Sequence, residues 1–168
     1  MTKRLSTTQV VYLALLIALN VTIARVFLIP VPMTRGNINL CDAGIFIAAM
    51  LYGRKQGAIV GGLSGLLLDL ISGYAQYMIF SLIVHGLEGY IAGFLAEKGK
   101  NSRAARFTGM GIGVIVMVIG YAITDTILYN WSAGFLSIPM NVIQGIAGGL
   151  VAYPLFVSIR KFAPRLSH

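Results

Sequence analysis

The sequence predicts an all-α integral membrane protein with six transmembrane helices, and three observations support this fold class. Of the 168 residues, 57% are hydrophobic and only 11% are charged. That leaves too few polar side chains to cover a soluble domain of this length. Apolar runs that approach the roughly 20 residues needed to cross a bilayer recur along the chain. The basic residues fall almost entirely on one side of these runs. We therefore expect one membrane domain over residues 1–168 and no sizeable soluble part.

Prolines, glycines and charges divide the chain into these six spans. The segment 29–41 contains two prolines and a glycine and predicts a loop, residues 53–57 predict a tight basic turn, and residues 130–139 predict a loop of amphipathic character. The second span has only about 11 residues, so it must either extend into the preceding loop or be shielded by its neighbours. The expected spans are Gln9–Leu28, Asp42–Tyr52, Ala58–Ile71, Met78–Ala96, Phe107–Tyr129 and Met140–Ile159.

The positions of the basic residues predict the orientation. If the N-terminus is cytoplasmic and the spans alternate, 11 of the 13 Lys and Arg residues lie on the cytoplasmic side, and only Arg25 and Arg35 lie toward the outside. Cytoplasmic loops retain Lys and Arg, so both termini are expected to be cytoplasmic. The cytoplasmic set is Lys3, Arg4, Arg54, Lys55, Lys98, Lys100, Arg103, Arg106, Arg160, Lys161 and Arg165. The net charge of +8 is then a topology signal and does not indicate nucleic acid.

With this orientation, the polar side chains gather in the outer half of the bundle, while the inner halves hold Leu, Ile, Val, Ala and Gly. A channel or proton wire would place polar groups through the full depth. The asymmetry instead predicts a substrate cavity that opens outward and is closed below. Its candidate residues are Tyr74, Gln76, Tyr77, His85, Glu88, Asp125, Tyr129, Trp131, Asn141 and Gln144.

His85 and Glu88 are the deepest of these candidates and lie three residues apart, on nearly one face of a helix. In one interpretation they form the floor of the ligand pocket, with Trp131 and either Tyr74 or Tyr77 stacking on the ligand ring above. In the other, they form a hydrogen bond with each other or tie two helices together. Ionisable groups inside a membrane are functional by default, which favours the first interpretation.

The other polar candidates also have structural alternatives. Asp125 shares a face with Tyr121 and Tyr129, yet tyrosines at a membrane boundary often only anchor a helix. Asp69 caps its helix or extends toward the interface as readily as it binds a ligand. Asp42 is expected to be a helix N-cap and not a ligand group. Trp131 is either an interface anchor or an aromatic lid.

Small residues indicate close helix contacts. Ala14 and Ala18 are four residues apart in the first span, a spacing that lets another helix approach closely. Gly61, Gly62 and Gly65 give the third span a similar face. No phosphate-binding loop, H-E-x-x-H motif or pair of cysteines is present, so ATP hydrolysis by this chain, a catalytic metal and a cofactor are not expected.

The stretch LCDAGIFIAAMLYGRKQGAIVGGLSGLLLDLISG, residues 40–73, together with Ala14, Ala18 and the six short spans, resembles the substrate-binding S component of energy-coupling factor (ECF) vitamin transporters. The family's G-[RK]-x-x-G turn is matched by Gly53, Arg54 and Gly57. The resemblance covers essentially the whole chain. It implies a six-helix fold in the prokaryotic plasma membrane and a vitamin-sized pocket near the extracellular face, with residues 29–41 as a lid.

The resemblance also implies partners: a transmembrane coupling protein, which Ala14 and Ala18 would meet, and two ATPases. It implies that the subunit topples within the membrane to carry its pocket inward. Metal-specific relatives use an external N-terminus as a ligand, whereas Lys3 and Arg4 place this N-terminus inside. The chain is most similar to members for hydroxymethylpyrimidine or pyridoxine. Pantothenate, thiamine and riboflavin stay open, and few outer cations make folate a poor candidate.

Two rival functions remain open from the residues alone. One is a stand-alone proton-coupled carrier that uses Asp69, Glu88 and Asp125. The other is a small membrane enzyme, which no motif favours.

Overall fold

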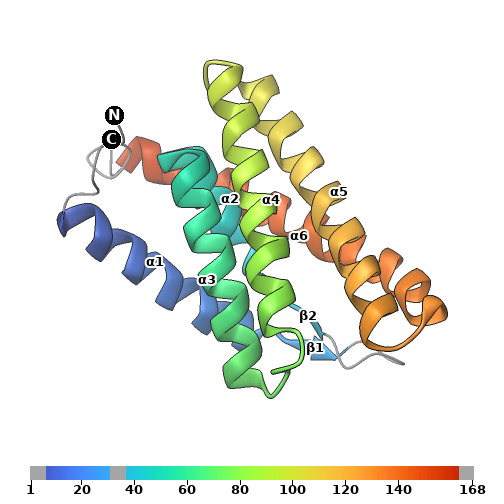
Figure 1. Ribbon diagram of the computed structural model, residues 1–168. Helices are drawn as coiled ribbons and strands as arrows, with labels where there is room; N and C mark the ends of the chain where they lie inside the picture. The colour runs from blue at the N-terminus through green and yellow to red at the C-terminus, as the bar shows by residue number, and fades with distance from the viewer. Residues whose placement is uncertain (1–6, 31–36, 163–168) are drawn as a thin grey trace.

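The computed structural model describes residues 7–30 and 37–162, which form six helices and one short strand pair. In chain order the elements are α1 (Thr7–Val26), β1 (Ile29–Pro30), β2 (Asn37–Ile38), α2 (Cys41–Tyr52), α3 (Arg54–Ser72), α4 (Met78–Lys98), α5 (Arg103–Leu128) and α6 (Trp131–Phe162). The two strands pair antiparallel, with Ile29 opposite Ile38, and lie at one end of the helix bundle (Figure 1). The predicted all-α class is confirmed. Lys3, Arg4, Arg35 and Arg165 lie outside the described residues.

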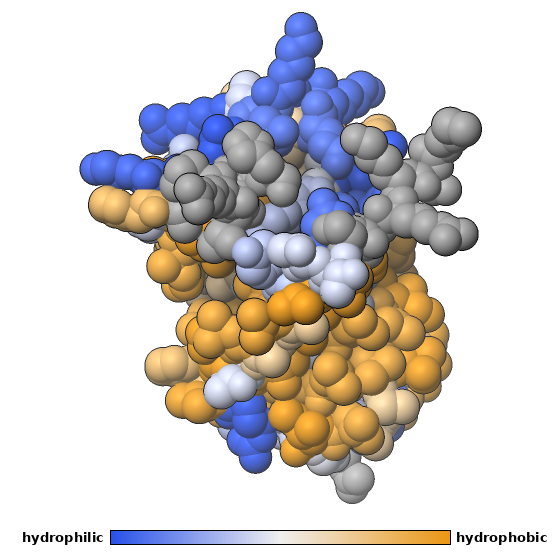
Figure 2. Space-filling model, turned by 90° about the vertical axis from the view of Figure 1, so that its left-hand side faces the viewer, coloured by the Kyte–Doolittle hydropathy of each residue, from blue (hydrophilic) through white to orange (hydrophobic). Residues whose placement is uncertain are grey.

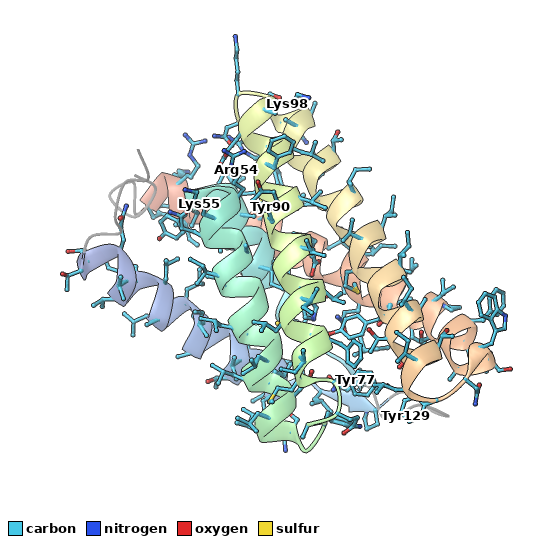
Figure 3. All side chains as sticks on the ribbon, in the orientation of Figure 1. Arg54, Lys55, Tyr77, Tyr90, Lys98 and Tyr129 are labelled. Atoms are coloured by element: carbon cyan, nitrogen blue, oxygen red, sulfur yellow. The ribbon has the colours of Figure 1, made fainter. Side chains whose placement is uncertain are left out.

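Length and composition make four of the described helices, α1, α4, α5 and α6, able to cross a membrane. The charged and aromatic residues mark two opposite ends of the bundle. Arg54, Lys55 and Lys98 lie at one end, which we call the basic end, while Tyr77 and Tyr129 lie at the other (Figure 3). Hydrophilic side chains gather at the basic end above a broad hydrophobic band (Figure 2). This distribution is that of a protein embedded in a bilayer.

The short helix α2 lies in the interior of the bundle. Every residue from Cys41 to Met50 is buried, and the helix packs against α1, α3, α4 and α6. Its 12 residues span only about 18 Å. Strand β2 precedes the helix closely, so α2 does not extend into the preceding loop. Of the two alternatives for this short span, shielding by neighbouring helices is therefore correct.

Helices α3 and α4 pack backbone against backbone through glycines. A Cβ atom added to Gly57 would lie 2.6 Å from the carbonyl oxygen of Gly89, and one added to Gly61 would overlap the carbonyl oxygen of His85. Side chains larger than hydrogen would push the helices apart. The glycines in the third span thus form a helix contact, as the sequence indicated, and α4 supplies matching glycines.

Two loop predictions were wrong. Residues 131–139 are the first turns of α6, since the Oδ1 atom of Asn130 accepts a hydrogen bond from the Ala133 N–H at 3.0 Å and starts the helix. Pro139 lies inside this helix, where the loss of one backbone hydrogen bond is tolerated in membrane helices. The predicted basic turn 53–57 consists of Gly53 alone, whose φ of 88° ends α2 and changes the direction of the chain before α3. Helix α3 then begins at Arg54.

Candidate functional site

A polar cavity lies at the end of the bundle opposite the basic end, where the strand pair meets α3, α4, α5 and α6. Its volume is about 30 Å³, room for a water molecule or two. Any organic ring is larger, so the lining would have to move apart to admit one. The lining residues are Asn37, Asn39, Gly65, Leu68, Asp69, Tyr77, His85, Tyr121, Asp125, Ser137, Asn141 and Gln144.

Hydrogen bonds of Asn39, the residue that follows β2, hold the strand pair over this cavity. The backbone N–H of Asn39 donates to Oε1 of Gln144 at 2.9 Å, which connects the strand pair to α6. The side chain of Asn39 accepts from the N–H of Cys41 at 2.8 Å and donates to Oδ1 of Asn37 at 2.7 Å. Asn39 therefore connects the strand pair, the start of α2 and α6. The strand pair can therefore move only if these hydrogen bonds break or if their partners move with it.

The floor of the cavity is built around His85. Its Nδ1 atom lies 2.7 Å from Oε2 of Glu88 and 3.5 Å from Oδ1 of Asp42. Both carboxylates are fully buried, whereas only His85 of the three lines the cavity. Glu88 therefore lies beneath the floor and supports His85. The prediction that Asp42 is an N-cap was wrong, because Leu40 occupies that position and Asp42 lies in the first turn of the helix.

Aromatic and acidic side chains form the α4–α5 wall. The hydroxyl of Tyr77 donates a hydrogen bond to Oδ1 of Asp125, and the hydroxyls of Ser81 and Tyr121 lie 2.7 Å apart. The ring of Tyr121 also meets that of His85 edge-on, with centroids 5.4 Å apart. These contacts hold Asp125 and His85 in fixed orientations on neighbouring walls of the cavity.

The structure brings five of the ten predicted substrate-binding residues to the cavity: Tyr77, His85, Asp125, Asn141 and Gln144. The other five do not line it. Glu88 supports His85, Tyr74 and Gln76 lie in the turn before α4, and the Nε2 atom of Gln76 contacts the hydroxyl of Tyr129 at 3.4 Å. Trp131 is 78% exposed and lies with Phe135 beside an outer apolar groove, because α6 begins earlier than predicted and turns this residue outward.

Several lining residues were not among the sequence candidates. Asn37 and Asn39 belong to a segment that the sequence predicts only as a loop, although two asparagines directly before a buried helix were a usable signal. Ser137 falls in the segment wrongly predicted as a second loop. Asp69, which was not on the list of candidates, lines the cavity, and its buried Oδ2 atom has no hydrogen-bond partner among the described residues.

Asp42, His85 and Glu88 are also the only group of metal-ligating side chains in the described part of the chain, with ligand atoms within 4.8 Å of one another. The 2.7 Å contact between His85 and Glu88 shows that the histidine nitrogen facing this group is already hydrogen-bonded. The geometry supports a hydrogen bond between His85 and Glu88 at this place. The expectation that the chain binds no metal stays a prediction.

Comparisons with known proteins agree on one family. The family model for the S component of ECF-type riboflavin transporters matches residues 4–161. The chain belongs to this family of S components. It is thus a subunit of a membrane transporter and not an enzyme, as the sequence predicted.

Individual relatives give the same picture. The thiamine precursor transporter HmpT of Lactococcus lactis subsp. cremoris is 37% identical over 150 residues, which cover 89% of this chain and 86% of the relative. An uncharacterized protein of Pyrococcus woesei is 31% identical over 133 residues, covering 79% and 88%. The solved S component of a bacterial ECF transporter has a TM-score of 0.65 and 25% identity, and the match covers 92% of this chain and 98% of that one.

In this S component, the predicted partner face lies on the outside of the bundle. Ala14 and Ala18 are exposed on α1, and each is followed by an exposed leucine, Leu15 and Leu19. Helix α1 packs mainly against α2 and α3 among the described helices. The two alanines are therefore free to meet a helix of another subunit, and their role in partner contact stays a prediction.

Proposed function

We propose that this S component captures a small heteroaromatic ring with several hydrogen-bond donors, with hydroxymethylpyrimidine as the first candidate and pyridoxine as the second. The observation that supports this most is the lining of the cavity, which combines two carboxylates, four amides, an imidazole and two phenols around a small volume. The name of the Lactococcus relative, a thiamine precursor transporter, supports the same class of ligand.

The charges of the cavity favour a neutral or weakly basic ligand. Asp69 and Asp125 both line it, and none of its lining residues is a lysine or arginine. Amino and hydroxyl groups on a ring would donate to these carboxylates, while a ligand carboxylate would face like charge. The same reasoning disfavours pantothenate and folate.

Size separates the ligand candidates further. The cavity of about 30 Å³ must widen even for one ring. Riboflavin carries three fused rings and a polyol chain, so its entry would require a far larger displacement of helices that are tied together by buried side-chain contacts. Thiamine carries a fixed positive charge and two rings, and its size lies between those of hydroxymethylpyrimidine and riboflavin. The family description therefore supports the subunit type, and the cavity supports the smaller ligand.

In the proposed orientation, this cavity lies near the extracellular side of the membrane. All six helices would cross or enter the bilayer as one domain, with both termini cytoplasmic. The basic end, which contains Arg54, Lys55 and Lys98, would face the cytoplasm. The strand pair over the cavity, held by Asn39 and Gln144, would act as the lid.

The proposed partners are a transmembrane coupling protein and two ATPases, with Ala14 and Ala18 at the contact. Energy would come from these ATPases, since the chain has no phosphate-binding loop of its own.

Titration calorimetry on the purified subunit tests the ligand proposal. Hydroxymethylpyrimidine, pyridoxine, thiamine, riboflavin and pantothenate would be compared, and native mass spectrometry would identify any ligand that copurifies. We expect hydroxymethylpyrimidine to bind tightest and Asp125→Asn to weaken its binding. Tightest binding of riboflavin would overturn the proposal. Uptake by this chain alone that a protonophore abolishes would instead favour a proton-coupled carrier.

A further inference from the structure

A second polar cavity lies at the basic end, away from the ligand cavity. It has a volume of about 110 Å³ and lies where α2, α5 and α6 meet the loop after α4. Its lining residues are Met50, Leu51, Asn101, Arg106, Phe156 and Arg160. Two guanidinium groups thus share one small cavity with an asparagine and an apolar wall.

In the described part of the chain, neither arginine of this cavity forms an ion pair with an acidic side chain. Of the five acidic residues in the chain, only Glu97 lies at this end, and it pairs with Arg54 at 3.5 Å. The Nε atom of Arg106 is buried and has no hydrogen-bond partner among residues 7–30 and 37–162. Two like charges around a common cavity repel each other, and a buried donor without a partner is costly. Both effects would be relieved by an anion.

A single aromatic ring holds both guanidinium groups. The Arg106 guanidinium lies 4.7 Å and that of Arg160 5.8 Å from the centroid of Phe156. The arginines are therefore held from two helices by one buried side chain. Guanidinium groups in this arrangement suit the paired oxygens of a phosphate group, which they bind with two parallel hydrogen bonds.

A long apolar groove begins beside this cavity. It runs between α5 and α6, has a volume of about 620 Å³ and is lined almost entirely by apolar atoms. Arg106 of the cavity and Met110 of the groove are one helical turn apart, and the rings of Phe156 and Tyr153 are 6.3 Å apart. Arg103 lies over Phe107 and Tyr153 at the same end of the groove.

We propose that this S component binds the phosphate group of an anionic phospholipid between Arg106 and Arg160, with an acyl chain of that lipid in the α5–α6 groove. The basic end places the phosphate at the level of the lipid headgroups, where basic pockets between membrane helices bind anionic lipids. The adjoining groove favours a lipid over free phosphate, because free phosphate has no acyl chain to occupy the groove. In the proposed orientation this is a lipid of the cytoplasmic leaflet.

The test uses the delipidated full-length subunit in a neutral detergent at about 0.15 M salt, where charges more than about 8 Å away are largely screened. Native mass spectrometry would measure binding of phosphatidylglycerol, phosphatidylcholine with the same acyl chains, and inorganic phosphate. We expect phosphatidylglycerol to bind at least about tenfold more tightly than either of the others, the low end for hydrogen bonds to charged groups.

Matched variants separate the cavity from the general positive charge. Arg106→Gln with Arg160→Gln should weaken phosphatidylglycerol binding at least about tenfold. Lys55→Gln with Lys98→Gln removes two charges at the same end and should change it less than about twofold. Because Arg160 is exposed, Arg160→Gln alone should fold and still weaken binding. Vitamin-site binding reports whether each variant is folded.

Three results would overturn the proposal. Equal losses in the two double variants would show a diffuse charge effect. Equal affinity for phosphatidylcholine would show that only the acyl chains bind. Phosphate that binds as tightly as phosphatidylglycerol would show a site for the free anion.

Discussion

The Nδ1 atom of His85 lies 2.7 Å from Oε2 of Glu88, and this contact connects the floor of the polar cavity to the buried interior of the bundle. The two nitrogens of an imidazole lie on different edges of the ring, so a bond at Nδ1 leaves Nε2 for other partners. Asp42 lies 3.5 Å from the same Nδ1 atom. Glu88 and Asp42 therefore orient the ring that lines the cavity.

Removal of the charge of Glu88 should weaken ligand binding through His85. Glu88→Gln keeps the shape of the side chain, and the loss of a hydrogen bond to a charged group corresponds to roughly 10- to 150-fold in affinity. If Glu88 acts through His85, the double variant Glu88→Gln/His85→Ala should bind no more weakly than His85→Ala alone in calorimetry. Additive losses would show that Glu88 contacts the ligand itself. Glu97→Gln, at the basic end, serves as the control.

Loss of the Gln144 acceptor should loosen the strand pair. Gln144→Leu leaves the buried N–H of Asn39 without a partner, at a cost of about 1–3 kcal/mol. We expect faster ligand dissociation with a smaller change in association, as measured by stopped-flow fluorescence or competition. The exposed Gln76→Leu should leave both rates unchanged. A Gln144→Leu variant that releases ligand at the parental rate would show that this hydrogen bond does not hold the lid.

Bulky residues on the alanine face should block transport and spare binding. Ala14→Trp or Ala18→Trp would prevent close approach of a partner helix, while both positions lie outside the ligand cavity. Vitamin uptake with the complete transporter should fall, and calorimetry on the isolated subunit should be unchanged. Leu87→Trp is the control, since Leu87 is 49% exposed on α4. Normal uptake by both alanine variants would mean that this face has no partner.

An added methyl group between α3 and α4 should destabilise the fold. Gly61→Ala would overlap the carbonyl oxygen of His85, and such overpacking costs about 1–3 kcal/mol. Gly111→Ala on α5 meets nothing within 4 Å and should stay within about 1 kcal/mol of the parent. Thermal unfolding in detergent measures both. Equal melting temperatures for the two variants would contradict close backbone packing of α3 on α4.

The sequence predicted those features that depend on local spacing. The helices and the shared face of His85 and Glu88 follow from hydrophobic runs and from the three-residue separation. The burial of Asp42 does not follow from local spacing, because an aspartate at the start of a helix can cap the helix or lie buried in the bundle. Only the packing of α2 against α4 shows that it lies beside His85.

The other errors have physical causes of the same kind. Gly134 and Pro139 are typical of loops in water, yet α6 continues through both, since Asn130 starts the helix and the bilayer favours closed backbone hydrogen bonds. The earlier start of α6 places Trp131 in the first turn of this helix, beside an outer apolar groove. The role of Asn39 depends on a hydrogen bond to Gln144, 105 residues further along the chain, which no local pattern indicates.

The enclosed position of α2 has a consequence for biogenesis. Its 12 residues are too few to be recognised as a membrane segment by themselves, and its first turn carries the acidic Asp42. Gly53 alone separates it from α3, so we expect the two helices to enter the bilayer together as a helical hairpin. The carboxyl of Asp42 then meets its histidine only when α4 has left the ribosome. The side chain that orients the cavity floor from α2 is thus in place before the histidine that it orients has been made.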